Sequence, residues 1–172
     1  MSSVGGGTAV SGMSRPAGLP ERPIREDARV TPEQITLVQE SFKKVAPIQE
    51  AAAELFYDRL FELDPTLRSL FQGDMKQQGH ELMSMIAAAV HGLNDLEQLL
   101  PVVRDLGIRH VGYGVLQKHY DTVGAALLWT LERGLGSDLT DETRRAWAAA
   151  YGLLAATMIE AAYGETLEVG RA

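Results

Sequence analysis

The chain has 172 residues, of which 45% are hydrophobic, and this length fits a single domain with one core. Its formal net charge is −7, from 16 basic and 23 acidic residues, and the absence of a clustered basic face argues against nucleic-acid binding. The sequence contains no cysteine, which excludes disulfide bonds and a thiolate-ligated cofactor, and it contains no apolar run long enough to indicate a membrane span.

Residues 1–30 are rich in glycine, serine and proline and show almost no apolar periodicity. Such a composition cannot bury enough apolar surface to offset the entropy lost on ordering, so we expect a disordered arm. The arm lacks the apolar core of a secretory signal, and we therefore expect a cytoplasmic protein. We place the folded domain at residues 31–166 and a flexible tail at residues 167–172.

From Thr31 onward every strong signal is helical, which predicts an all-α fold. Thr31-Pro32 with Gln34 forms a capping-box pattern that begins the first helix, and Pro47 interrupts it. A second helix runs to Asp64-Pro65, where another cap and proline begin a short helix that ends near Phe71. The apolar stripes predicted for the first two helices are Ile35, Val38, Phe42 and Val45, and then Ala53, Phe56, Leu60 and Leu63.

The next helix is predicted from about residue 75 to 91, and residues 94–97 read as a capping box for the helix that follows. Two longer helices close the chain, the first of them stopped by Gly134 and Gly136. The apolar positions of these three helices are Leu82, Ile86, Ala89 and Leu93, then Tyr120, Val123, Leu127 and Leu131, and finally Trp147, Tyr151, Leu154 and Met158.

The helix that begins at residues 94–97 carries His110 at the end of the apolar stripe Leu99, Val103 and Leu106. Gly112 and Gly114 end this helix. A neutral imidazole on the apolar face of a helix is the usual proximal ligand of a haem iron. The same pattern also fits a hydrogen-bonded core histidine, and periodicity alone leaves both interpretations open.

Residues 55–163 resemble the single-domain bacterial globins without an obvious gap, and they are also similar to neuroglobin and to the globin domain of flavohaemoglobins. The resemblance rests on LFYDRLFELDPTLRSLFQ, DLGIRHVGYG, KHYDTVGAALL and TRRAWAAAYG. Residues 31–50 fit the first globin helix less specifically. The resemblance implies a globin fold whose helices pack around a pocket for haem b.

The resemblance also implies individual roles. His110 corresponds to the proximal iron ligand, and Phe71 to the phenylalanine that packs against the porphyrin. Tyr57 and Gln78 fall where the family places polar side chains that reach the bound gas, and Leu82 lies one helical turn after Gln78. The residues that resemble the proximal lining are Leu106, Val115, Tyr120 and Val123.

These roles imply a haem protein that reversibly binds dioxygen, for storage, delivery or sensing. Bound dioxygen carries partial negative charge, and a hydrogen bond from Tyr57 or Gln78 stabilises it by roughly 1.5–3 kcal/mol. Carbon monoxide gains far less from the same donors. An alternative is a nitric oxide dioxygenase that works with a separate reductase. A third hypothesis is a globin-fold interaction module without haem.

One departure from the flavohaemoglobin pattern lies in the last helix. There the proximal histidine is held by a tyrosine, matched by Tyr120, and by a glutamate whose expected position is Ala162, with Glu160 and Glu165 as the nearest carboxylates. A carboxylate partner would make the imidazole more basic. Its absence disfavours peroxidase-like O–O activation relative to reversible binding.

Other interpretations remain open for several side chains. Tyr57 and Phe71 also fit plain core aromatics, and Gln78 also fits a solvated surface residue. His80 lies about 200° around the helix from Gln78, so both cannot point at one iron. We expect structural or solvated roles for His80, His91 and His119.

Overall fold

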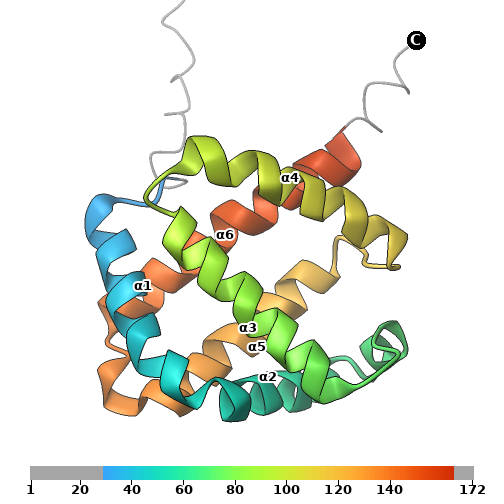
Figure 1. Ribbon diagram of the computed structural model, residues 1–172, viewed down its shortest axis with the longest axis horizontal. Coiled ribbons are helices and arrows are strands. Elements are labelled where there is room, and N and C mark those ends of the chain that lie inside the picture. Colours follow the sequence, from blue (N-terminus) through green and yellow to red (C-terminus); the bar gives the residue numbers. More distant parts are fainter. Residues whose placement is uncertain (1–28, 165–172) are drawn as a thin grey trace, which may run out of the picture.

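The computed structural model describes residues 29–164, and this part of the chain is helical without a β-strand (Figure 1). None of its helices is long and apolar enough to cross a membrane. Most of the expected arm and residues 167–172 of the tail lie outside the described residues, whereas Val30 already packs against the core. The elements are α1 (Pro32–Val45), η2 (Ala46–Ile48), α2 (Gln49–Leu63), η3 (Pro65–Leu70), α3 (Met75–Gly92), α4 (Leu96–Gly112), α5 (His119–Leu135), η4 (Gly136–Asp138) and α6 (Asp141–Tyr163).

The helix starts follow the predicted caps with one correction. The Thr31 hydroxyl accepts from the Gln34 backbone N–H at 3.2 Å, and the Gln34 side chain accepts from the Thr31 N–H at 3.0 Å. The prediction for residues 94–97 was wrong by one residue, because Asp95 caps α4 by accepting from the Gln98 N–H at 3.3 Å. Asp95 is already tied into the preceding turn by its N–H bond to the Gly92 carbonyl, which leaves its carboxylate at the helix entrance.

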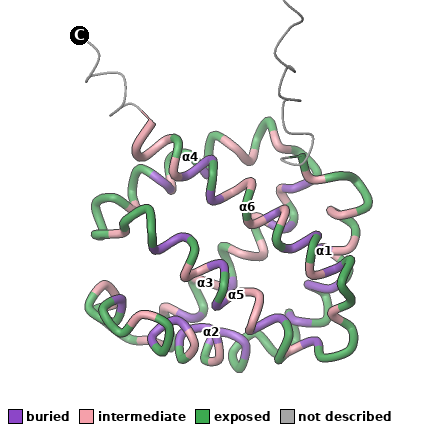
Figure 2. The backbone as a smooth tube through the Cα atoms, turned by 180° about the vertical axis from the view of Figure 1, so that it is seen from behind, coloured by how far each residue is buried: buried purple, intermediate pink, exposed green. Residues whose placement is uncertain are grey.

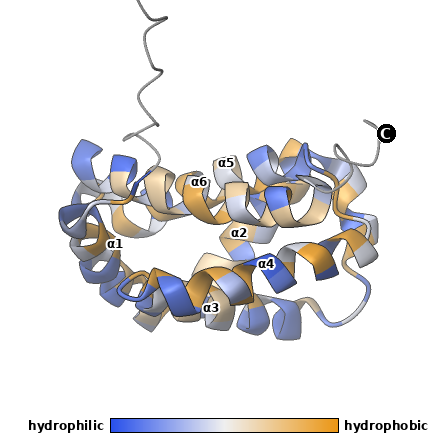
Figure 3. Cartoon of the chain, turned by 90° about the horizontal axis from the view of Figure 1, so that it is seen from above, coloured by the Kyte–Doolittle hydropathy of each residue, from blue (hydrophilic) through white to orange (hydrophobic). Residues whose placement is uncertain are grey.

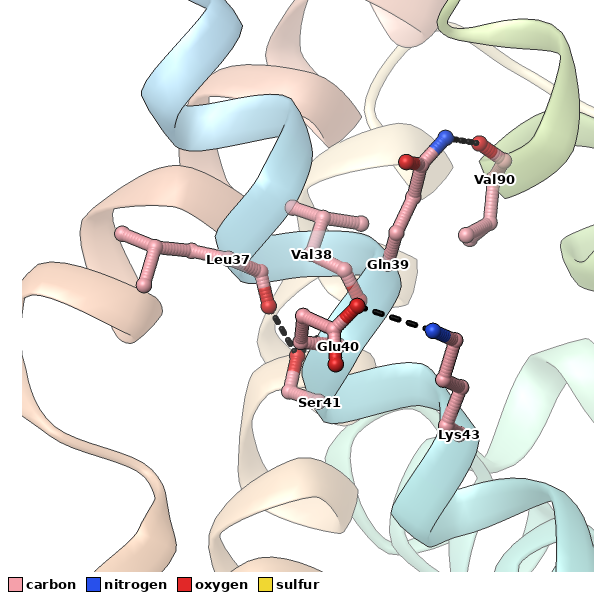
Figure 4. A network of polar contacts seen from close by, with 7 residues as sticks. All are labelled: Leu37, Val38, Gln39, Glu40, Ser41, Lys43 and Val90. Carbon is pink, nitrogen blue, oxygen red and sulfur yellow. Dashed lines mark hydrogen bonds and ion pairs between the residues drawn. The ribbon is translucent and has the colours of Figure 1, made fainter.

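Most of the core lies where α1, α3, α5 and α6 meet, and each of these helices carries buried residues, drawn in purple in Figure 2. Val38 is fully buried in this core. A hydrogen bond also ties α1 to the end of α3, since the Gln39 side-chain amide donates to the Val90 carbonyl at 3.0 Å (Figure 4).

Leu63 departs from its predicted stripe, because its exposed fraction is 41%. It is the last residue of α2, and the backbone leaves helical geometry at Asp64. Leu67 of the following η3 is 3% exposed and packs in the same cluster as Leu60. The chain therefore covers Leu60 with η3 rather than with the last turn of α2.

Candidate functional site

An aromatic cluster on α2 forms one side of the candidate site. The Tyr57 ring meets the Phe71 ring edge-on with centroids 5.2 Å apart, and it stacks with Phe61 at 5.9 Å. Phe71, Leu82 and Val123 pack against this cluster as half-buried side chains. Four of the predicted site residues are thus brought together from α2, α3, α5 and the segment after η3. We call this group the Tyr57 cluster.

The Tyr57 hydroxyl points at α3 and donates to the backbone carbonyl of Gln78 at 3.3 Å. This distance exceeds the usual range for O–H···O bonds, so the bond is weak. Burial, together with the negative charge of Glu81, raises the pKa of Tyr57 to about 12. The hydroxyl therefore stays protonated at neutral pH and keeps its capacity to donate. The resemblance alone implied a bound gas as the hydrogen-bond partner of the Tyr57 hydroxyl, whereas the structure shows the Gln78 backbone carbonyl as its partner.

The approach of α2 to α3 depends on a glycine beside Gln78. A Cβ added at Gly79 would lie 3.0 Å from the Cβ of Ala53. Helix axes can come this close only where the contact residues are small. The small pair therefore sets the distance at which Gln78 meets Tyr57.

A second cluster, built from α4, α5 and α6, contains the other apolar site residues. Its buried members are Val103, Tyr120, Ala155 and Met158, and Leu106 and Val115 pack against them as half-buried side chains. We call this group the Tyr120 cluster. Three of the four residues expected in the proximal lining are here.

Val123 is the exception, because it was expected beside Tyr120 but packs against the Tyr57 cluster. The two residues are three positions apart on α5 and so lie on nearly the same face, one turn apart along the axis. Helix α5 contributes to both clusters, so two of its residues that are one turn apart can pack in different clusters.

His110 lies in the last turn of α4 as a half-buried side chain. Its Nδ1 is 2.8 Å from the Leu106 carbonyl, which requires the proton on Nδ1 when the ring is neutral. Burial lowers the pKa of His110 below its ordinary value, and the nearby charge of Arg109 acts in the same direction. The imidazole is therefore neutral at physiological pH, and among the described residues only its Nδ1 has a hydrogen-bond partner, which leaves the lone pair of Nε2 for a ligand.

A close contact between α4 and α6 positions this imidazole. A Cβ built at Gly107 would lie 2.5 Å from the backbone oxygen of Met158. Only glycine allows the two backbones to approach so closely, and His110 follows one helical turn later. Sequence reasoning missed Gly107, although a glycine in a helix interior is itself a signal of close approach because it otherwise costs stability.

Two tyrosines of α6 hold the backbone around the Tyr120 cluster. The Tyr163 hydroxyl donates to the Val115 carbonyl at 2.8 Å, and the Tyr151 hydroxyl donates to the Tyr120 carbonyl. The Val115 N–H in turn bonds the His110 carbonyl at 3.1 Å. Sequence reasoning assigned neither tyrosine to the site, because nothing local marks partners that are 31 and 48 residues away.

The remaining histidines lie apart from this arrangement. His80 and His91 are exposed. His119 is buried and structural, since its Nδ1 accepts from the Leu116 N–H at 2.9 Å. Ala162 is half-buried and Glu160 is exposed, while the other nearby carboxylate of the sequence, at position 165, lies outside the described residues.

The two clusters and His110 fit a haem by their chemistry. A haem needs apolar surface to cover its ring and one axial nitrogen for its iron. The apolar side chains predicted to touch it are mostly half-buried rather than buried, so they retain apolar surface that a flat ring would cover. These half-buried residues are Phe71, Leu82, Leu106, Val115 and Val123.

Comparison with known proteins identifies the family of the chain. The family model described as Globin matches residues 54–158. The chain is 38% identical over 133 residues to the flavohemoprotein of Bordetella parapertussis, a match that covers 76% of this chain and 33% of that protein. The chain thus spans about a third of the length of the curated relatives it matches.

Solved structures show the same similarity. An engineered carbene transferase from Rhodothermus marinus, a protein named as a nitric oxide dioxygenase, is 25% identical with a TM-score of 0.72, covering 83% of this chain and 100% of that one. A bacterial globin from Campylobacter jejuni is 27% identical with a TM-score of 0.67, covering 79% of this chain and 99% of that one. With the helical fold and the family match in agreement, the chain belongs to the globin family of haem-binding proteins.

Proposed function

We propose that this protein binds haem b through His110 and reversibly binds dioxygen beside Tyr57 and Gln78. The observation that carries the proposal is the bond from Nδ1 of His110 to the Leu106 carbonyl. It fixes the tautomer, and burial keeps the ring neutral, so Nε2 is ready to ligate. When bound, the haem supplies an iron with one further position for a diatomic gas.

The chain's own residues would hold the group from two sides. The Tyr120 cluster would cover one face together with the ligand on α4, and the Tyr57 cluster would cover the other. The residues proposed to hold it are Leu106, His110, Val115 and Tyr120 on the first side, and Phe71, Leu82 and Val123 on the second.

Tyr57 and Gln78 would give the pocket its preference among gases. The Tyr57 hydroxyl is buried and protonated, and its bond to the Gln78 carbonyl is long enough to exchange readily for a better acceptor. Dioxygen is polarised in such a site and accepts strong hydrogen bonds, whereas carbon monoxide gains much less. The pocket should therefore retain dioxygen selectively.

The second candidate function is the conversion of nitric oxide to nitrate with dioxygen. It is favoured by the similarity to flavohemoproteins and to the Rhodothermus marinus protein named as a nitric oxide dioxygenase. Repeated turnover consumes one electron per nitric oxide, which we propose comes from a separate reductase. In this function Tyr57 would again act by holding dioxygen in place.

Absorption spectroscopy of the purified protein tests the first proposal. We expect a Soret band that shifts on reduction and again with dioxygen or carbon monoxide. The ferrous protein without gas should be five-coordinate, because Gln78 is a poor iron ligand and His80 is exposed. The sharp visible bands of a low-spin bis-histidine haem would contradict the assignment.

Mixing the oxygenated protein with nitric oxide separates the two functions. Formation of one nitrate per haem, with continued turnover only when a reductant is present, supports the dioxygenase. Recovery of the oxygenated spectrum without nitrate excludes it and leaves reversible dioxygen binding.

A further inference from the structure

Exposed apolar side chains are frequent in α4 and in the segment that follows it, within the described part of the chain. Eight large hydrophobic side chains are exposed there, and five of them fall within residues 102–116. Isolated exposed apolar residues are ordinary, whereas a contiguous group marks an interaction surface. The five, with their exposed fractions, are Val102 (60%), Ile108 (56%), Val111 (44%), Tyr113 (62%) and Leu116 (52%). We call residues 102–118 the α4 face.

The middle of the α4 face, at Ile108, lies on the outside of the helix that carries the proposed iron ligand, whereas the Tyr113 ring lies 5.9 Å from the His110 ring. Figure 1 shows α4 along one edge of the molecule, and Figure 3 shows hydrophobic and hydrophilic segments alternating along it. The buried positions Val103 and Gly107 turn toward α6. Ile108 is about 200° around the helix from His110 and so points away from the pocket.

The charge of the α4 face is opposite to that of the whole chain. Arg104, Arg109 and Lys118 contribute +3 and Asp105 contributes −1, a net +2 against −7 for the protein. The three basic side chains are exposed, and none forms an ion pair with another described residue. Arg104, Ile108 and Val111 follow the i, i+4, i+7 spacing of one helix stripe, whereas Val102 lies about 180° around the helix from Val111. Exposed apolar side chains beside unpaired positive charge complement a partner whose own contact surface is acidic.

We propose that the α4 face docks an acidic electron-carrier protein that reduces the haem iron. This inference rests on the proposed function, which needs one electron whenever the iron has become ferric. The carrier loses that electron and the ferric iron gains it, so the step balances. The charge of the face favours an acidic partner, and a carrier docked on α4 is separated from the His110 side by roughly the helix diameter of 10–12 Å.

Stopped-flow reduction of the ferric protein tests the surface, with reduced plant-type [2Fe–2S] ferredoxin as the acidic carrier. At low salt, Arg104→Glu/Lys118→Glu should lower the second-order rate constant by about tenfold, because steering is lost. The difference should disappear near 0.5 M salt, at about which charges are screened. Reduction by photoreduced lumiflavin, which is small and uncharged, should not change.

The matched control carries the same charge change on another helix. Lys43→Glu/Lys44→Glu alters two exposed lysines of α1 and should leave the rate with ferredoxin within about twofold of the parent. Ile108→Gln should lower the rate at all salt concentrations, because it removes apolar contact rather than charge. Equal slowing by the α1 control would show that only net charge matters, and the α4 face would be refuted.

Calorimetric titration with oxidised ferredoxin measures docking without electron transfer. Weaker binding in Arg104→Glu/Lys118→Glu, with normal binding in the α1 control, supports the proposal. Two results overturn it: a concentration-dependent dimer that the α4 variant dissolves, or binding to phosphatidylserine vesicles that the variant loses. Absence of a Soret band or of dioxygen binding would refute the proposed function. The titration would still show whether the α4 face binds ferredoxin.

Discussion

The hydroxyl of Tyr57 offers the sharpest test of the distal pocket. Tyr57→Phe deletes one oxygen and keeps the ring contacts with Phe56, Phe61 and Phe71, whose centroids lie 5.3, 5.9 and 5.2 Å from it. The only described hydrogen bond lost is the one to the Gln78 carbonyl at 3.3 Å. A neutral bond of that length contributes less than about 1 kcal/mol, so the variant should fold normally.

The change in dioxygen dissociation rate and affinity depends on which hydrogen bonds the Tyr57 hydroxyl makes before and after the gas leaves. Losing a hydrogen bond of about 1.5 kcal/mol to the polarised gas should raise the dioxygen dissociation rate about tenfold, because nothing replaces the bond until the gas has left. The parent protein then regains the Gln78 bond, worth about 0.5–1 kcal/mol, which offsets part of the difference at equilibrium. The dioxygen affinity should therefore fall by only about two- to fivefold.

Stopped-flow displacement measures both gases. Carbon monoxide dissociation should change by less than about twofold, since it gains little from the donor. Gln78→Leu removes a second donor but leaves the carbonyl that Tyr57 uses, and the double variant should be non-additive if both donors engage one gas atom.

Equal acceleration of both gases in Tyr57→Phe would refute this reasoning. It would mean that the side chain controls access to the pocket by its bulk. The hydrogen-bonding mechanism would then have to be abandoned.

Three further outcomes are expected. His110→Ala should abolish the Soret band or weaken haem retention strongly, with exposed His91→Ala as the control; an unchanged spectrum would show that another residue ligates the iron. Gly107→Ala should destabilise the protein by about 1–3 kcal/mol, because its Cβ would collide with the backbone of α6, whereas Gly112→Ala meets nothing within 4 Å; equal melting temperatures for the two variants would contradict this. Because the pKa of Tyr57 is raised from 10.0 to about 12, its hydroxyl should still donate near pH 10.5, where about three quarters of ordinary tyrosines are ionised. The dioxygen dissociation rate should thus be flat up to that pH, and a rise with a midpoint near 10 that vanishes in Tyr57→Phe would show an unshifted group.

Sequence alone predicted the helix boundaries well where the signal is local. The cap at Thr31, the Asp64-Pro65 start of η3 and the end of α5 at Gly136 depend on bonds or backbone angles within a few residues. The place of His110 on the apolar stripe of α4 also follows from helical periodicity. These features are determined by neighbours close in the chain, so reading the chain is enough to find them.

Tertiary packing decided everything that depends on two distant segments. Periodicity shows which face of a helix is apolar but does not show which partner covers it. The Gln78 carbonyl as the partner of Tyr57 and the placement of Val123 with the Tyr57 cluster follow from how α2, α3 and α5 cross. The contact of Gly107 with α6, which positions the proposed iron ligand, exists only once residues about fifty positions apart are brought together.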